Sequence, residues 1–183
     1  MTATTAPAAP RTLLSARSPE HAEIIREAVT MTLYVSVVEI AELAVLPAEH
    51  RSGGHVDGPV GAELLAIIWG TAIGLAIAHW FAFRLAGRAF RGDRVTGLDT
   101  KVGLAQVGAA VFVALVSSVP VLLFDDVGAQ IVTGWIPAVL IGGVGYLIAR
   151  ETGRSRWSAA VYGLTALALG LLVAGVKSAL AGH

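Results

Sequence analysis

The stretch VGAELLAIIWGTAIGLAIAHWFAF, residues 60–83, contains a single Asp, Glu, Lys or Arg residue, Glu63, in 24 residues. A helix needs about 20 mostly apolar residues to cross the hydrocarbon core of a bilayer, so this stretch is long enough to span it. Four more stretches reach the same length, and they are residues 24–46, 102–124, 127–149 and 157–176. The sequence therefore predicts an all-α, polytopic membrane protein with five transmembrane helices.

The overall composition agrees with a single membrane domain. Of the 183 residues, 55% are hydrophobic and 14% are charged, whereas a soluble domain carries about 25% charged residues. The mean hydropathy is +0.72. We expect residues 22–183 to form the membrane domain, and residues 1–21, which are rich in Ala, Thr and Pro, to form a disordered cytoplasmic tail.

Several functional classes are disfavoured by composition and motifs. The formal net charge is zero, so no basic excess indicates nucleic acid as a partner. The chain has no cysteine, which excludes disulfides, thiolate metal sites and cysteine nucleophiles. No Walker, GxSxG, HExxH or haem-attachment sequence is present. We therefore expect no enzymatic activity and no cofactor, and the sequence identifies no metal.

Turn-forming and charged segments separate the five apolar stretches. These segments are Pro47 with residues 52–59, residues 84–101, Asp125-Asp126, and residues 150–156. The Asp125-Asp126 break is the shortest. A single helix over residues 102–149 would be longer than any bilayer is thick, so we predict a helical hairpin there.

The basic residues are distributed unevenly between the two predicted sides of the membrane. Eleven of the thirteen Lys and Arg residues fall on one side: three in the N-terminal region up to Arg26, five in residues 84–101 and three in residues 150–156. Only Arg51 and Lys177 fall on the other side. Because cytoplasmic loops carry the excess of basic residues, we expect the N-terminus inside, the C-terminus outside, and a location in the inner membrane.

Ionisable side chains inside the spans are the candidates for a functional site. Glu39 and Glu42 lie one turn apart, and Ser36 and Thr32 continue the same helix face. A charge at the bilayer centre costs at least about 2.5–3.5 kcal/mol, so this face is expected to meet protein or water. We predict that Gly70 and Gly74 let the second span approach this face closely, which would bring Glu63 to Glu39 and Glu42 in the outer half.

Three interpretations of these carboxyl groups remain open. They can be solvated or paired for structural reasons, they can form a cation or proton site, or they can serve a hydrolytic two-carboxylate enzyme. His79, near the inner end of the second span, is a candidate proton relay, and the alternative is an amphipathic anchor beside Trp80. A small cation- or proton-linked transport unit is the function that we predict, and a non-transporting accessory or structural membrane protein is the alternative.

Small residues and a proline indicate where helices approach one another. Pro137 and Gly142 predict a kinked packing helix in the fourth span, and Gly170 belongs to a small-residue face in the fifth. Five helices without an internal repeat rarely enclose a pathway alone. We therefore expect a homodimer in the lipid bilayer, with Gly70 and Gly74 or the fifth-span face as its interface.

The runs MTLYVSVVEIAELAVL (31–46) and LLAIIWGTAIGLAIAHWFAFRLAGR (64–88), with the ending GRSRWSAAVYGLTALALGLLVAGVKSALAGH (153–183), resemble a group of small, uncharacterised bacterial integral membrane proteins. Five spans and the Gly-Arg-Ser turn before the last one are also similar to vacuolar-iron-transporter-like proteins. The second resemblance implies a shared architecture. It does not extend to that family's metal-binding residues, which have no counterpart in this chain.

Overall fold

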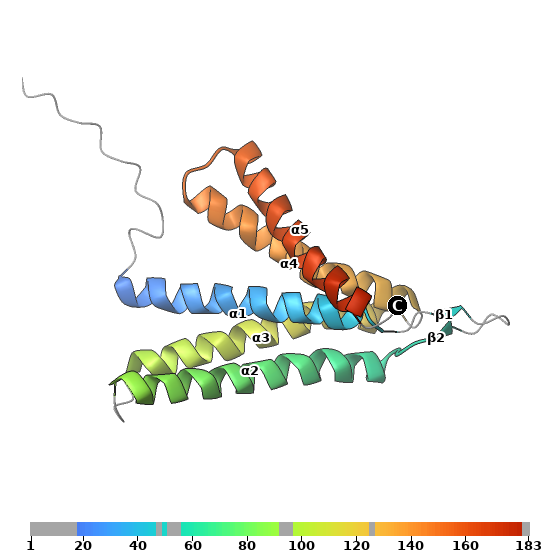
Figure 1. The fold of residues 1–183 in the computed structure, drawn as a ribbon, viewed down its shortest axis with the longest axis horizontal. Coiled ribbons are helices and arrows are strands. Elements are labelled where there is room, and N and C mark those ends of the chain that lie inside the picture. The colour runs from blue at the N-terminus through green and yellow to red at the C-terminus, as the bar shows by residue number, and fades with distance from the viewer. Residues whose placement is uncertain (1–17, 47–48, 51–55, 92–96, 125–126, 181–183) are drawn as a thin grey trace, which may run out of the picture.

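The computed structural model describes residues 18–46, 49–50, 56–91, 97–124 and 127–180. Its five helices are α1 (Pro19–Leu43), α2 (Ala62–Arg91), α3 (Gly97–Leu123), α4 (Val127–Glu151) and α5 (Arg156–Leu180) (Figure 1). Between α1 and α2, a two-residue antiparallel ladder pairs β1 (Glu49–His50) with β2 (Val56–Asp57). The helical fold class is confirmed, and the short β-hairpin is an addition to the predicted loop.

The helix boundaries differ from the predicted spans mainly at the charged segments. α2 continues to Arg91 and α3 begins at Gly97, so both helices extend into the predicted connection at residues 84–101. The predicted break between the third and fourth helices is confirmed, because α3 ends at Leu123 and α4 begins at Val127. The two aspartates of this break lie outside the described residues.

α1 begins earlier than predicted. The Ser18 side chain accepts a hydrogen bond from the backbone N–H of His21 at 3.4 Å, and Pro19 occupies the first helical turn with Glu20. A serine cap, an early proline and an acidic first turn are all signals of a helix start. Helical structure therefore covers the last residues of the predicted tail over residues 1–21, and residues 1–17 lie outside the described part of the chain.

Four of the five helices, α2 to α5, are long and apolar enough to cross a membrane, and α1 is not among them. The prediction of five spans is thus supported for four helices. Arg26 and Glu27 near one end of α1, and Glu39 and Glu42 near the other, enclose an uncharged stretch at residues 28–38. That stretch is roughly 16 Å long at a rise of about 1.5 Å per residue. A hydrocarbon core is about 30 Å thick.

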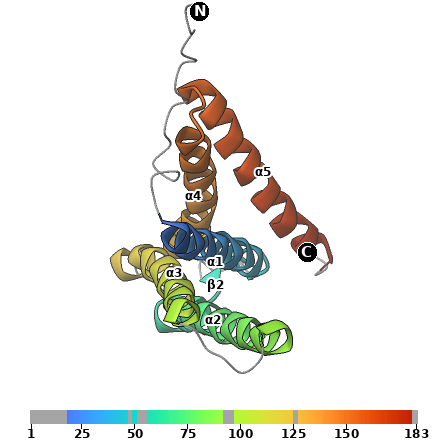
Figure 2. The same cartoon turned by 90° about the vertical axis from the view of Figure 1, so that its left-hand side faces the viewer.

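α1 nevertheless occupies the centre of the bundle. It packs against each of the other four helices, and Figure 2 shows it between the α2–α3 pair and the α4–α5 pair. α1 begins at one end of the bundle and α5 ends at the other (Figure 1). We call the first end, where α1 and α3 begin, the basic end, after Arg26, Arg84 and Lys101, and the opposite end, near β1 and β2, the hairpin end.

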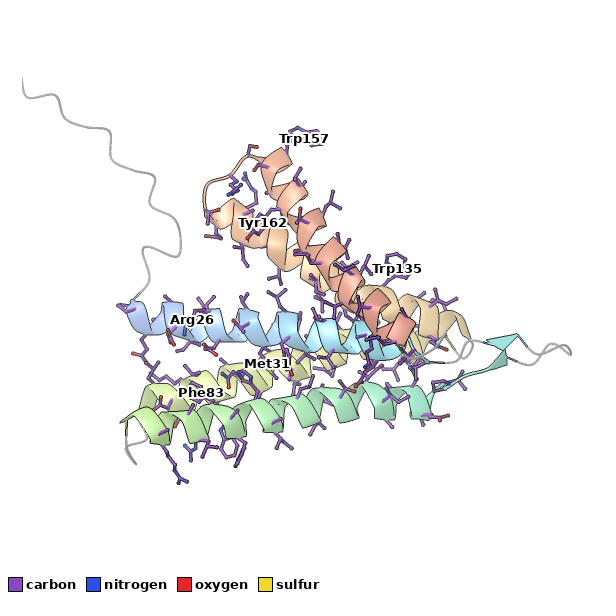
Figure 3. All side chains as sticks on the ribbon, viewed as in Figure 1. Arg26, Met31, Phe83, Trp135, Trp157 and Tyr162 are labelled. Carbon is purple, nitrogen blue, oxygen red and sulfur yellow. The ribbon has the colours of Figure 1, made fainter. Side chains whose placement is uncertain are left out.

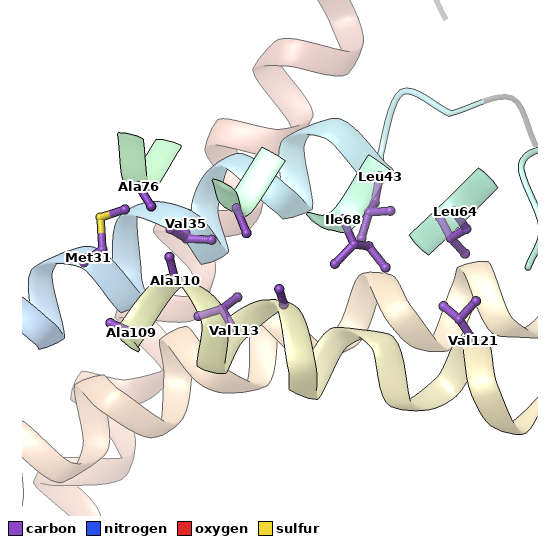
Figure 4. Close-up of a cluster of buried hydrophobic side chains, with 12 residues drawn as sticks. Met31, Val35, Leu43, Leu64, Ile68, Ala76, Ala109, Ala110, Val113 and Val121 are labelled. Atoms are coloured by element: carbon purple, nitrogen blue, oxygen red, sulfur yellow. The ribbon is translucent and has the colours of Figure 1, made fainter. Parts of the chain in front are cut away.

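An apolar cluster holds α1, α2 and α3 together (Figure 4). Met31 and Val35 of α1 pack with Ile68 of α2 and Val113 of α3, and each of these side chains is fully or almost fully buried. Short alanines on α2 and α3 fill the remaining space and bring the helices close. This cluster occupies the middle of the three-helix layer.

α4 and α5 meet through glycines instead. A Cβ atom added at Gly163 of α5 would lie 2.6 Å from the carbonyl oxygen of Gly142 on α4, and one added at Gly145 would lie 2.9 Å from the Ala166 Cβ. Gly170 is similarly closed off by the side chain of Ile141, and Pro137 is fully buried. Of the predicted packing residues, Gly142 and Gly170 therefore lie in the α4–α5 contact.

Large apolar side chains cover the outside of the molecule. Trp157 is 84% exposed at the far end of the α4–α5 pair, and Trp135 points away from the bundle (Figure 3). Exposed leucines, valines and isoleucines continue along α2 to α5. Soluble monomers rarely expose contiguous apolar patches larger than a few hundred Å². The surface is thus compatible with a lipid environment around the helices.

Candidate functional site: a buried polar junction

Seven polar side chains are buried in the described part of the chain, and they come from α1, α3 and α4. They are Ser36, Glu39, Gln106, Ser117, Ser118, Gln130 and Thr133. Six of the seven have at least one side-chain oxygen without a hydrogen-bond partner among the described residues, and Ser118 is the exception. Buried polar groups in proteins are normally hydrogen-bonded, so such a concentration of unpartnered groups requires an explanation.

Glu39 is the charged residue of this set. It is 2% exposed, and neither of its carboxyl oxygens has a hydrogen-bond partner among the described residues. Ser117 of α3 faces the carboxyl group but does not complete a hydrogen bond of normal geometry. Ser36 lies one turn earlier on the same face of α1 and is fully buried. An ionised carboxylate in this position would need a proton or a cation to balance it.

The α3–α4 helical hairpin supplies the opposite wall. Ser117 lies six residues before the end of α3, and Thr133 lies six residues after the start of α4, so each lies about 9 Å along its helix from the α3–α4 break. Both are fully buried, and α1 packs against both helices. We call Ser36, Glu39, Ser117 and Thr133 the polar junction. Carboxyl and hydroxyl oxygen atoms such as these can bind a proton, and they are the ligands that alkali and alkaline-earth cations prefer.

The neighbouring serine shows what a fully bonded side chain looks like in the same helix. Ser118 donates a hydrogen bond to the Ala114 carbonyl at 2.7 Å and accepts one from the Trp69 Nε1–H at 3.1 Å. It thereby ties α3 to α2. Ser117 and Ser118 are consecutive and both buried, but only Ser118 has a structural role that its hydrogen bonds explain.

A pocket of about 320 Å³ opens between α1, α4 and α5 beside the polar junction. Its lining includes Ile40, the chain neighbour of Glu39, and Gln130, which lies one turn before Thr133 on α4. The side-chain oxygen of Gln130 is buried and has no hydrogen-bond partner among the described residues. Gln130 therefore extends the unpartnered polar groups from the junction toward the hairpin end.

The third predicted carboxyl group, Glu63, is not brought to Glu39 and Glu42, which interact electrostatically on α1. Glu42 is half-buried and accepts a hydrogen bond from the Thr71 hydroxyl of α2. Glu63 is exposed in the first turn of α2, eight residues before Thr71, which is roughly 12 Å along the helix. The expected approach of Gly70 and Gly74 to α1 is also wrong, because a Cβ atom at either glycine would meet no atom within 4 Å.

His79 lies on the α1–α2 contact, away from the junction. Its ring centroid is 6.4 Å from that of Tyr34, which precedes Glu39 by five residues on α1. It follows Thr71 by eight residues, so it lies roughly 12 Å from the Glu42–Thr71 bond toward the basic end. The proposed role of His79 as a proton relay stays a prediction.

A second polar contact between α1 and α3 lies nearer the basic end. The Gln106 side-chain amide donates to the Glu27 carboxylate at 2.9 Å, and Arg26 donates to the same carboxylate at 3.1 Å. The apolar cluster around Met31 and Val113 separates this contact from the polar junction (Figure 4). The described residues thus form two polar contacts that are separated by a layer of apolar side chains.

Beyond the junction, the first turns of α1 and α3 are joined at the surface. The Lys101 ammonium donates to the Glu20 carboxylate at 2.6 Å, and this bond lowers the pKa of Glu20 from its ordinary value. Both side chains are partly exposed, so solvent screens the pair. The contact aligns the two helices at the basic end.

Sequence reasoning did not identify Ser117, Thr133 and Gln130 as members of the site. A single hydroxyl or amide residue changes the mean hydropathy of an apolar helix little, and its depth of burial depends on the partner helix. Among the described residues, no group of three or more His, Asp or Glu side chains could hold a metal ion. Comparisons of the chain with protein families, with curated protein sequences and with solved structures return no match.

Proposed function

We propose that this protein is a small transport unit that binds a proton or a monovalent cation at Glu39. The supporting observation is a carboxyl group that is 2% exposed, has no hydrogen-bond partner among the described residues, and faces the unpartnered hydroxyl group of Ser117. A carboxylate desolvated without compensation is costly. A bound ion removes that cost and supplies partners for the oxygens of Ser36, Ser117 and Thr133.

The charge of the junction indicates the valence of its ligand. Glu39 is the only acidic residue of the junction, and Glu42 is already bonded to Thr71 on the α2 side. One carboxylate balances one positive charge. Divalent ions such as Ca²⁺ commonly bind several carboxylate oxygens together with carbonyls and waters. A proton or a monovalent cation therefore fits this site better than a divalent cation does.

The same proposal places α1 across the bilayer as a fifth span, enclosed by the other four helices. Its charged and hydroxyl side chains face protein instead of lipid at Ser36 and Glu39, which are buried. The N-terminal region and the two connections of the basic end hold eleven of the thirteen Lys and Arg residues. This distribution favours an inner-membrane protein with the N-terminus in the cytoplasm and the C-terminus outside.

A homodimer through α2 completes the proposal. Small residues recur at every fourth position along one stripe of α2, and all of them are exposed. They are Ala62, Ala66, Gly70, Gly74, Ala78, Ala82 and Ala86. Gly163 and Gly170 of α5 are instead buried against α4. Of the two faces predicted for dimerisation, the one around Gly70 and Gly74 is open to a second copy.

Reconstitution into liposomes tests the transport proposal. Wild-type protein in vesicles loaded with a pH-sensitive dye is expected to dissipate an imposed proton or sodium gradient, and Glu39→Gln is expected to abolish that flux. Glu63→Gln is the matched control, since Glu63 is exposed and lies outside the junction. Unchanged flux through a correctly folded Glu39→Gln protein would refute the assignment.

The alternative function is a non-transporting accessory or structural membrane protein. Two observations favour it: the Glu42–Thr71 and Ser118–Trp69 bonds show that polar groups of this chain do join helices. In that case Glu39 would serve packing, and Glu39→Gln would lower the thermal stability of the protein in detergent. The transport proposal predicts no such loss, because glutamine keeps the shape of the side chain and removes the buried charge.

A further inference from the structure

A long groove runs between α2 and α3 on the surface of the bundle. Its volume is about 420 Å³, and it follows α2 from Trp69 to Arg84 and α3 from Asp99 to Val111. These segments are about 22 Å and 18 Å long at a rise of about 1.5 Å per residue. Half of a hydrocarbon core is about 15 Å. The groove is therefore long enough for the acyl chain of one leaflet.

The two ends of the groove differ in chemistry. Apart from the Trp69 indole, alanines, valines, leucines and isoleucines line its middle and its hairpin end, whereas Arg84, Asp99 and Thr100 line the basic end. The Trp80 indole closes the floor here, because a Cβ atom at Gly103 would lie 3.2 Å from its Cδ1 atom. The groove thus combines an apolar channel with a polar mouth, as an amphiphile does.

Arg84 makes the mouth positive. Its guanidinium lies over the Trp80 ring, 5.2 Å from the ring centroid, and it belongs to none of the ion pairs among the described residues. Asp99 at the same end is engaged in an interaction of its own. A guanidinium held by an aromatic ring at the membrane interface is a suitable donor for a phosphate group.

A second hollow also adjoins Arg84. It has a volume of about 200 Å³ and is lined by Trp80, Phe81, Arg84, Leu85 and Arg88. Arg84 and Trp80 therefore border both hollows, and Arg88 also lines the second. Two acyl chains that diverge from one phosphate have this geometry.

We propose that Arg84 and Trp80 bind the headgroup of an anionic phospholipid, with one acyl chain in the α2–α3 groove and the other beside Leu85. Basic pockets between transmembrane helices at the cytoplasmic side are a recognised type of anionic-lipid site. The proposal is independent of the ligand of Glu39. It adds a lipid partner at the end of the bundle opposite to the polar junction.

Lipid titration of the delipidated full-length protein, followed by native mass spectrometry, tests this site. Phosphatidylglycerol is expected to bind more tightly than phosphatidylcholine with the same acyl chains. Arg84→Gln should weaken phosphatidylglycerol binding about fivefold, which corresponds to about 1 kcal/mol per basic residue. It should also remove the preference between the two lipids. Arg84→Lys should keep the preference. Arg156→Gln, an exposed basic residue outside the groove, should bind as the wild type does.

A second pair of variants tests the acyl-chain channel without touching the charge. Val107 lines the groove and Val139 is exposed on α4 away from it. Val107→Trp should reduce the binding of both lipids, and Val139→Trp should not. This pair decides the question if Arg84→Gln fails to fold. Three results would overturn the proposal. They are equal binding of the two lipids by the wild type, wild-type lipid binding by Arg84→Gln or Val107→Trp, and equal occupancy by water-soluble glycerol phosphate.

Discussion

The α1–α3 and α4–α5 contacts join helices of similar length but bury different groups. Between α4 and α5, Gly142 and Gly163 bring the two backbones together, and a Cβ atom at Gly163 has no room. Between α1 and α3, Glu39 and Ser117 are buried with unpartnered oxygens. The α4–α5 contact is explained by dispersion and by the close approach of the two backbones alone.

The α1–α3 contact is not explained by packing in the same way. A buried group without a hydrogen bond costs about 1–3 kcal/mol, and more if it is charged. Alanines or leucines would join α1 and α3 at lower cost. Under our proposal, a ligand of Glu39 accounts for the buried polar groups on the α1–α3 side, whereas the α4–α5 side serves cohesion.

The largest expected effect comes from breaking the glycine contact. Gly163→Leu places a side chain against the Gly142 backbone, which cannot move aside as a flexible side chain can. We expect a loss of about 3 kcal/mol or more in the free energy of unfolding, the upper range for overpacked sites. Gly175→Leu on the same helix is the control, since a Cβ atom there meets nothing within 4 Å. Denaturation in mixed detergent micelles measures both.

If Gly163→Leu unfolds no more easily than Gly175→Leu, the close approach of α4 and α5 does not contribute to stability. The α4–α5 contact could then no longer be contrasted with the α1–α3 contact as the one that stabilises the fold. The cohesion of the bundle would then come from the apolar cluster of α1, α2 and α3 instead.

A smaller effect separates the two consecutive serines of α3. Ser118→Ala removes the acceptor of the Trp69 Nε1–H bond and should lower the free energy of unfolding by about 1–3 kcal/mol. Ser117→Ala removes a hydroxyl without a partner, so it should leave stability nearly unchanged and weaken the response to the ligand of Glu39. Thermal melts with and without that ligand measure both quantities. The reverse pattern would make Ser117 structural.

Much of the fold could be predicted from apolar length, and the two contacts show where this stops. The helices α2 to α5 follow from uninterrupted apolar stretches, and their breaks follow from Pro, Gly and charged residues. The partner of each glycine does not follow, because Gly70 and Gly163 look alike in the sequence but one is open and the other is closed.

The site shows the same limit. Glu39 is a candidate from sequence because a carboxyl group inside an apolar stretch is unusual, and the structure buries it against protein, one of the two surroundings expected for its helix face. Its separation from Glu63 depends on how α2 packs against α1, and the selection of Ser117 over Ser118 depends on which side chain Trp69 reaches. Hydropathy and helical periodicity contain no information on these inter-helix contacts.

The smallest expected effect belongs to the exposed ion pair between the starts of α1 and α3. Lys101 lowers the pKa of Glu20, so the folded protein binds a proton there less readily than the unfolded chain does. This contribution to stability is present above the unfolded pKa of about 4.3 and is lost as the pH falls through the lower folded value. Glu20→Gln should lack this part of the acid dependence in thermal melts below about pH 4.3, and high salt should diminish it in the wild type. An identical acid dependence in both proteins would show that the pair contributes nothing.

The most direct test of the central claim is a thermal-melt screen of the purified protein against mono- and divalent cations from pH 5 to 8. A ligand that binds only the folded state stabilises it by about 2.7 kcal/mol at a hundredfold excess over its dissociation constant. We predict a selective shift of the melting temperature with protons or one monovalent cation, which Glu39→Gln abolishes and Glu63→Gln retains. No shift in the wild type, or the same shift in Glu39→Gln, would contradict the assignment of Glu39 as a binding site.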